Sequence, residues 1–183
     1  LGRRPTREEY AKAERAWEAV LDLDALGKAE GVSWVWHGAK VLKPEDRLCL
    51  LSLSPGGSDA DVVRESDLAT KSFVEGGFHV PEAKSSVTWR DRDSLWIGTD
   101  FGPGSMTESG YPRLAKLWKR GTPLESAELV YEGSTTDVWI AVMHDSTPGF
   151  ERDFATRGIT FWTNEIAILR KGKWLPIAKQ DDA

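Results

Sequence analysis

From residue 32 onward, apolar and polar positions alternate in short runs that are typical of β-strands. Runs rich in Val, Ile, Leu, Thr and Trp are separated by clusters of Gly, Pro, Asp and Ser, as strands and tight turns alternate in all-β proteins. Turns are expected at residues 55–57, 102–104 and 171–173. Strands are expected at residues 33–42, 47–53, 62–68, 86–91, 95–100, 113–119, 129–132, 137–144, 159–169 and 174–178.

The chain before residue 32 has a helical pattern. Thr6 and Glu9 have the spacing of a capping box. Apolar side chains then recur at three- and four-residue steps, at Tyr10, Ala13, Trp17, Val20 and Leu21. The sequence predicts one amphipathic helix here and no second helix.

Three tryptophan-containing segments recur in the β-rich part. Trp34, Trp89 and Trp139 each open a unit, and they lie 55 and 50 residues apart. Four strands in a unit of about 40 to 50 residues is typical of a β-propeller blade. The alternative is a β-sandwich of about ten strands with accidental spacing.

The repeat predicts an all-β fold. We expect a partial β-propeller of about three four-stranded antiparallel blades, preceded by one N-terminal α-helix. The expected domains are residues 1–31 (helix and linker) and 32–183 (partial propeller), with approximate blades at 32–80, 81–133 and 134–183.

Tryptophan is unusually abundant, with 9 residues among 183. Beyond the three that open the units, Trp96, Trp118 and Trp162 fall on later expected strands. Aromatic side chains on strands are most often buried between sheets. We therefore expect most of the tryptophans to pack between blades and not to serve as platforms for sugars.

Charge and cysteine content indicate which classes of partner and which cellular compartment to expect. With 24 Lys and Arg against 29 Asp and Glu, the net charge is -5, which disfavours nucleic acid as a partner. No apolar run reaches the roughly 18 to 20 residues that span a bilayer, and the first residues do not resemble a signal peptide. The single cysteine, Cys49, lies in an apolar run and is expected to be buried. We expect a cytoplasmic location, with the periplasm left open, and no membrane partner.

Two segments partly match known catalytic motifs. Residues 100–102 read Asp-Phe-Gly, as in protein kinases, but the glycine-rich and His-Arg-Asp motifs of kinases are missing. Residues 56–60 approach the Gly-x-Ser-x-Gly elbow of serine hydrolases but lack its last glycine. Both segments are interpreted as turns.

Histidines and acidic pairs do not form a metal-site pattern. His37, His79 and His144 lie far apart, and only His144 has an acidic neighbour, Asp145. The acidic pairs at 22/24, 59/61 and 91/93 have turn-like contexts and no complete calcium loop. We expect no metal and no cofactor.

The middle of the chain resembles a known family. Residues 77–85, 89–105, 109–113 and 118–124 are similar to the propeller region of bacterial prolyl oligopeptidase family proteins. The similarity continues on both sides, at residues 16–26, 52–60 and 147–154, and so covers nearly all of the chain.

This resemblance implies a part of a serine endopeptidase. Family members carry a seven-bladed propeller that caps an α/β-hydrolase domain with a Ser-Asp-His triad, and the propeller admits short peptides while excluding folded proteins. No residue of this chain matches the triad, so the chain alone should be inactive. Trp17 is expected to dock on the propeller or on the absent catalytic domain.

The resemblance also implies two substrate-channel candidates, Ser85 and His144. In classical members an inner-strand arginine contacts the peptide, roughly where this sequence reads Met143-His144-Asp145. Another contact is an aromatic residue just after the Lys84 position, where this chain has Ser85. The missing arginine puts strict post-proline recognition in doubt, and the alternative is that both are ordinary strand-end residues.

The expected partners are a short peptide substrate, the missing catalytic domain and the remaining blades. Because each blade buries two faces, an isolated arc of three is expected to self-associate. A rival hypothesis is a self-contained tryptophan-rich β module that binds carbohydrate or a protein. A third is a small hydrolase complete in this chain, which requires a Ser, His and Asp that converge in space.

Overall fold

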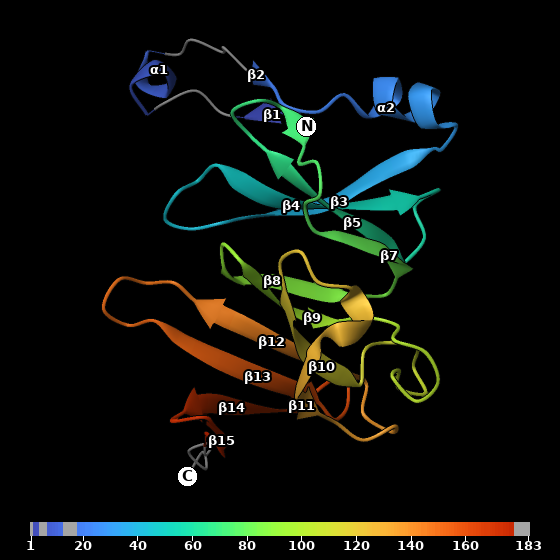
Figure 1. Cartoon of the computed structure of the whole chain (residues 1–183), viewed down its shortest axis with the longest axis vertical. Coiled ribbons are helices and arrows are strands. Elements are labelled where there is room, and N and C mark those ends of the chain that lie inside the picture. The colour runs from blue at the N-terminus through green and yellow to red at the C-terminus, as the bar shows by residue number, and fades with distance from the viewer. Residues whose placement is uncertain (1, 4–6, 13–17, 178–183) are drawn as a thin grey trace. The chain divides into compact units, whose positions relative to one another are not determined.

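The structure, a computed structural model, describes residues 2–3, 7–12 and 18–177 (Figure 1). It divides into two compact units. The first unit contains residues 1–41 and 46–82, and the second contains residues 42–45 and 83–183.

The first unit is built around a five-stranded antiparallel sheet. Strands β3 to β6 follow one another in order, and β7 also pairs with β5. A short pair of strands, β1 and β2, lies outside this sheet. The elements are β1 (Gly2–Arg3), α1 (Arg7–Ala11), β2 (Glu18–Ala19), α2 (Leu23–Glu30), β3 (Trp34–Val41), β4 (Leu48–Pro55), β5 (Asp61–Asp67), β6 (Ser72–Phe73) and β7 (His79–Ala83).

The helical segment differs from the prediction. A helix that continues to Leu21 is wrong at its end, because Glu18–Ala19 forms β2. The pattern also missed α2, which begins where the Asp22 carboxylate accepts the N–H groups of Asp24 and Ala25. No residue of α2 is fully buried, and the helix contacts the core of the first unit through the half-buried Leu23 and Leu26. Trp17 lies outside the described residues.

The second unit contains two four-stranded antiparallel sheets. Their strand orders are β8-β9-β10-β11 and β12-β13-β14-β15, with each strand beside its sequence neighbour (Figure 1). The elements are β8 (Ser86–Asp91), β9 (Ser94–Gly98), β10 (Leu114–Lys119), a 3₁₀ turn (Leu124–Ser126), β11 (Glu128–Glu132), β12 (Trp139–Asp145), β13 (Arg152–Gly158), β14 (Asn164–Arg170) and β15 (Lys173–Pro176).

The two sheets pack face to face. Trp96 and Ala115 of the β8–β11 sheet share one buried cluster with side chains of the β12–β15 sheet, namely Ile140, Val142, Ala155 and Ala167. The first strands of the sheets are also joined directly, since the Thr88 hydroxyl donates to the Val142 carbonyl at 3.0 Å. Successive four-stranded sheets that bury one face against the next are the packing unit of a propeller.

Among the described tryptophans, burial follows the prediction except at Trp36, which is 46% exposed, and at Trp162. Trp96, Trp118 and Trp89 are buried. Trp162 was expected on a strand, but it lies in the turn before β14 and is 93% exposed. The predicted strand at 159–169 therefore began too early, and β13 was not predicted.

The expected turns are present. Gly102 and Gly104 have positive φ angles of 99° and 80°, which glycine adopts without strain. The Asp100 carboxylate accepts the Gly102 N–H at 2.8 Å, so residues 100–102 form a turn closed by an aspartate side chain. No helix in the described part of the chain is long and apolar enough to cross a membrane.

Candidate functional site

Strands β8 and β12 are edge strands, each paired on one side within its sheet. Ser85 comes just before β8, and His144 lies near the end of β12. Trp139, at the start of β12, lines the same groove as Ser85. Because a strand rises about 3.3 Å per residue, His144 lies about 16 Å further along β12. The structure thus does not bring the two candidates together.

The hydroxyl of Ser85 is engaged within the protein. It lies 2.7 Å from the Thr99 hydroxyl and donates to the Ala83 carbonyl at 3.4 Å. Thr99 is buried. These contacts hold the Ser85 side chain in place and leave its hydroxyl without a base.

His144 belongs to a polar cluster around the buried Asp153. The Asp153 Oδ1 atom lies 2.9 Å from His144 Nδ1 and accepts the Trp96 indole N–H at 2.9 Å. The Arg90 guanidinium lies over the Trp96 ring, with Arg90 Nε 4.0 Å from Asp153 Oδ2. The cluster fixes the His144 ring near the end of β12.

Asp145 is not the partner of His144, although the sequence placed them side by side. Its carboxylate accepts both the hydroxyl and the N–H of Thr147, at 2.6 and 3.0 Å. These two hydrogen bonds lower the pKa of Asp145. Asp145 therefore shapes the turn after β12, and the partner of His144 comes from the next strand, β13.

The described residues contain no hydroxyl paired with a histidine base. In this part of the chain no serine or threonine hydroxyl is hydrogen-bonded to His37, His79 or His144. No three His, Cys, Asp or Glu side chains within it gather in a metal-binding arrangement.

The acidic pairs mostly serve local structure. Asp22 caps α2, and Asp91 accepts the Asp93 N–H in a turn. Asp61 instead pairs with His37 at 2.7 Å. Cys49 is fully buried, as predicted, and burial raises the pKa of its thiol to about 11.

A groove with aromatic walls opens beside Ser85. Its volume is about 390 Å³, and Tyr111, Pro112, Trp139 and Phe161 line it. Tyr111 lies in the turn between β9 and β10, and Phe161 lies in the equivalent turn between β13 and β14. The sequence analysis missed both residues, although their signal was an aromatic residue in the same turn of two successive units.

One face of the β12–β15 sheet is apolar and exposed. Val142, Ala155 and Ala167 lie on the buried face, so the residues next to them point the opposite way. We call this opposite side the open face. Its exposed apolar side chains are Met143, Ile166, Leu175 and Ile177, with exposed fractions of 52%, 40%, 47% and 46%.

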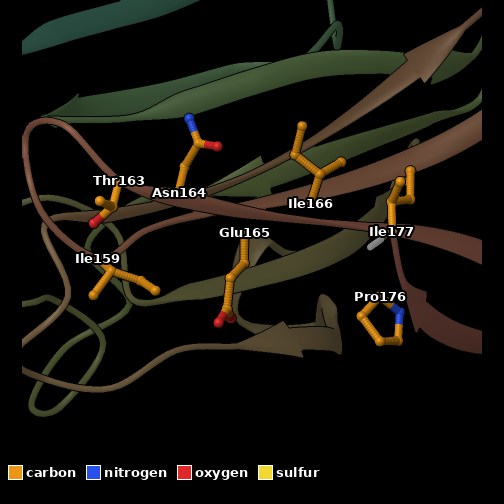
Figure 2. Close-up of a pocket in the computed structure, with 7 residues that line it drawn as sticks. All are labelled: Ile159, Thr163, Asn164, Glu165, Ile166, Pro176 and Ile177. Carbon is orange, nitrogen blue, oxygen red and sulfur yellow. The ribbon is translucent and has the colours of Figure 1, made fainter. Parts of the chain in front are cut away.

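The end of the same sheet is hollowed. A pocket of about 490 Å³ is bounded by strand β14, the turn before it and the end of the described chain (Figure 2). Figure 2 shows Ile166 and Ile177 beside each other, with Ile159 further along, and Pro176 below Ile177. Its polar lining includes Glu165 but no histidine, serine or cysteine, so its residues suit packing better than catalysis.

Relatives of known sequence match almost the whole chain. Residues 3–149 match the family model described as the prolyl oligopeptidase N-terminal β-propeller domain. The uncharacterized peptidase y4nA of Sinorhizobium fredii is 42% identical over 94% of this chain and 24% of its own length. An uncharacterized peptidase of Rickettsia prowazekii is 31% identical over 72% of this chain and 19% of its own length.

Solved structures give the same result. A post-proline cleaving enzyme from Rickettsia typhi superposes with a TM-score of 0.86 and 26% identity, over 96% of this chain and 27% of that one. Oligopeptidase B from Leishmania major superposes with a TM-score of 0.66 and 14% identity over 95% of this chain and 23% of that one, which shows the fold alone.

The fold and the comparisons agree. The predicted all-β propeller with antiparallel four-stranded sheets is confirmed. The chain spans about a quarter of the length of the Sinorhizobium fredii peptidase and of the Rickettsia typhi enzyme. It belongs to the prolyl oligopeptidase family and corresponds to part of the N-terminal β-propeller domain.

Proposed function

We propose that this chain is the part of a serine endopeptidase that gates access of short peptides to a catalytic α/β-hydrolase domain outside the chain. The observation that supports this most is the family match over residues 3–149. The described residues supply propeller sheets but no serine or threonine hydroxyl hydrogen-bonded to a histidine, so catalysis would come from another domain. By itself the chain should not hydrolyse peptides.

The packing suggests how the gate would work. The propeller blades would correspond to residues 32–80, 81–133 and 134–183. Their first strands, including β8 and β12, would line the channel, because these edges are unpaired within their own sheets. Strands held in sheets with buried faces deform little, so a channel between them would admit an extended peptide and exclude a folded domain. Ser85 and His144 would be contacts on this route.

The open face suggests where the rest of the propeller attaches. Four exposed apolar side chains on one sheet face are costly in water. A further sheet of the same polypeptide would cover them, as the β12–β15 sheet covers Trp96 and Ala115. The isolated chain should therefore self-associate through this face. Light scattering at micromolar concentration should show dimers or larger species, and a stable monomer would contradict this expectation.

The proposed substrate is a short peptide. The relative from Rickettsia typhi is a post-proline cleaving enzyme. In this chain, however, no arginine stands at residues 143–145, which favours a broader preference than cleavage after proline alone.

The test uses the polypeptide extended to the length of its relatives. It should cleave an eight-residue peptide at least 100-fold faster than the same sequence placed in an exposed loop of a folded protein. The 183-residue chain should cleave neither substrate. Equal rates on both substrates would contradict the proposal that the propeller excludes folded proteins. Peptide hydrolysis by the 183-residue chain would contradict the proposal that catalysis takes place in another domain.

A further inference from the structure

The pocket at the end of the β12–β15 sheet has a counterpart in the preceding sheet, where the site is filled. Ile140 of β12 is fully buried and belongs to the cluster that contains Trp96 and Ala115 of the β8–β11 sheet. Its backbone N–H donates to the Pro112 carbonyl at 2.9 Å. Gly133, just after β11, leaves room for this side chain, because a Cβ atom there would lie 2.5 Å from Ile140 Cδ1. The β8–β11 sheet thus receives one side chain from the first strand of the next sheet.

The strand registers show which residues of the two sheets are equivalent. In the β8–β11 sheet the first residue of the first strand, Ser86, pairs with Gly98, the last residue of the second strand. In the β12–β15 sheet Trp139 and Gly158 occupy the same two positions and also pair. Gly98 and Gly158 therefore hold the same place in the two sheets.

Counting from these glycines makes Ile166 equivalent to Leu117. Two residues before the first glycine, Trp96 pairs with Leu117. Two residues before the second, Thr156 pairs with Ile166. Leu117 packs against the cluster that contains Ile140, whereas Ile166 is 40% exposed and lines the pocket (Figure 2). Since Thr156 is much smaller than the tryptophan at the equivalent position, the sheet is hollow beside Ile166.

Asn164 in the pocket is likewise equivalent to Ala115. Each lies two residues before the residue just compared and so on the same face of its strand. Ala115 is buried in the cluster with Ile140, and the exposed Asn164 lines the pocket (Figure 2). The pocket is thus the equivalent, on the open face, of the site that holds Ile140.

The repeat also indicates which side chain the pocket would hold. Val87 and Ile140 are the second residues of β8 and β12, and both are buried. Both are branched at Cβ, as suits the pleated surface of a strand. They lie 53 residues apart, and the same step leads to a position about ten residues after Ala183 in a longer polypeptide. The relatives are about four times as long as this chain.

The walls of the pocket suit an uncharged side chain. The carboxylate of Glu165 is paired with Arg157 at 3.4 Å. The other lining residues are uncharged, and four of them are apolar, namely Ile159, Ile166, Pro176 and Ile177. An aliphatic side chain placed here would remove apolar surface from water on both sides of the contact.

We propose that this pocket holds a valine or isoleucine at the second position of the first strand of the next propeller sheet, supplied by the same polypeptide beyond residue 183. The side chain lies against Asn164 and Ile166, in the way that Ile140 lies in the preceding sheet. The proposal rests on the proposed function, because that function assumes further propeller sheets. It adds which residue of the next sheet enters which site, and so fixes the register between the two sheets.

The first test needs only the sequence of the longer polypeptide. Valine or isoleucine should stand where the next strand aligns with Val87 and Ile140, within about fifteen residues after Ala183. Any other residue at the aligned position would overturn the proposal.

The second test is cysteine crosslinking in the polypeptide extended to the length of its relatives. Asn164→Cys is combined with a cysteine at the aligned position, and a short bifunctional thiol reagent joins the pair. The joined peptides are quantified by mass spectrometry. In one control the second cysteine stands one residue earlier, where its side chain points to the other face of the strand. In the other, Leu129→Cys on β11 replaces Asn164→Cys, because Leu129 is exposed on a different sheet. Unchanged circular dichroism spectra show that each variant folds.

The Asn164→Cys pair should be joined at least tenfold more than either control pair. A yield no higher than that of the controls, including no crosslink at all, would overturn the proposal. If Ile166→Cys is nonetheless protected from a maleimide, a further sheet covers the open face in another register. No hydrolysis is measured, so the proposed endopeptidase function fails only in the cleavage experiment.

Discussion

The two sheets of the second unit have the same strand order but differ in how deeply their residues are buried. All five residues of β9 in the β8–β11 sheet are buried. In the β12–β15 sheet, β13 alternates between buried and half-buried residues, and β14 has one fully buried residue, Ala167. In the β12–β15 sheet the open face leaves Met143, Ile166, Leu175 and Ile177 exposed, and this is the face that we propose further propeller sheets cover.

The largest effect should come from truncating the buried face of the β12–β15 sheet. Ile140 is fully buried and packs in the cluster with Trp96. Ile140→Ala should lower the free energy of unfolding by about 2 to 5 kcal/mol, measured by urea denaturation. Ile166→Ala, the same change on the open face where the residue is 40% exposed, should cost less than about 1 kcal/mol. Equal losses would contradict the distinction between the two faces.

The next largest loss of stability should come from removing the ion pair between Asp137, just before β12, and Arg157 on β13. Arg157 Nε donates to Asp137 at 2.7 Å, and the Ser134 N–H donates to the same carboxylate. Burial raises the pKa of Asp137, but these hydrogen bonds outweigh it, so the pKa lies below its usual value. Asp137→Asn should cost about 2 to 3 kcal/mol at pH 7. Glu165→Gln is the control, because Glu165 is the exposed second partner of Arg157, and it should cost less than about 0.5 kcal/mol.

The same pair predicts the direction of the pH dependence. A lowered pKa in the folded state means that the stabilisation is complete above the unfolded value of about 3.9. It is lost as the pH falls through the folded pKa. In the first unit, Asp67 should behave likewise, because the hydrogen bond from Arg47 lowers its pKa to about 2. Urea denaturation between pH 7 and pH 2 should show a steeper loss of the free energy of unfolding for the native chain than for Asp137→Asn. An equal loss in both proteins would contradict the contribution assigned to Asp137.

A smaller effect should come from Gly158, which keeps β13 clear of the Trp139 ring. Gly158→Ala should cost about 1 to 2 kcal/mol, because the new methyl group would overlap the indole. Gly38 on β3 is the control, since a Cβ atom there meets nothing within 4 Å. Gly38→Ala should change the midpoint of thermal unfolding very little. A similar shift for both variants would mean that the Trp139 ring is not held by Gly158.

Regular patterns in the sequence predicted much of the fold. Strand β8 has the predicted bounds, and the repeat of Trp34, Trp89 and Trp139 marks the first long strand of each sheet. Strand β13 escaped prediction for a physical reason. Its side that faces the β8–β11 sheet carries Asp153, Ala155 and Arg157, so no large apolar residue stands at these alternate positions.

The candidate sites were harder to predict, because they depend on contacts between distant strands. His144 has an acidic neighbour in sequence, yet its carboxylate partner is Asp153 on the adjoining strand. Tyr111 and Phe161 are fifty residues apart and line one groove only because two equivalent turns lie close together. Ser85 was placed by family resemblance, and its role in the channel remains a prediction.

The most direct test of the account is the solvent accessibility of the open face. Cys49, the single native cysteine, is buried with a raised pKa, so it should react very slowly with a water-soluble maleimide. Ile166→Cys should be labelled rapidly in the 183-residue chain at concentrations low enough to keep it monomeric. It should be labelled at least 100-fold more slowly in the polypeptide extended to the length of its relatives. The control, Leu129→Cys on the outermost strand β11, replaces a residue that is 54% exposed and should react equally fast in both. Equal labelling of Ile166→Cys in the two proteins would contradict the claim that further propeller sheets cover this face.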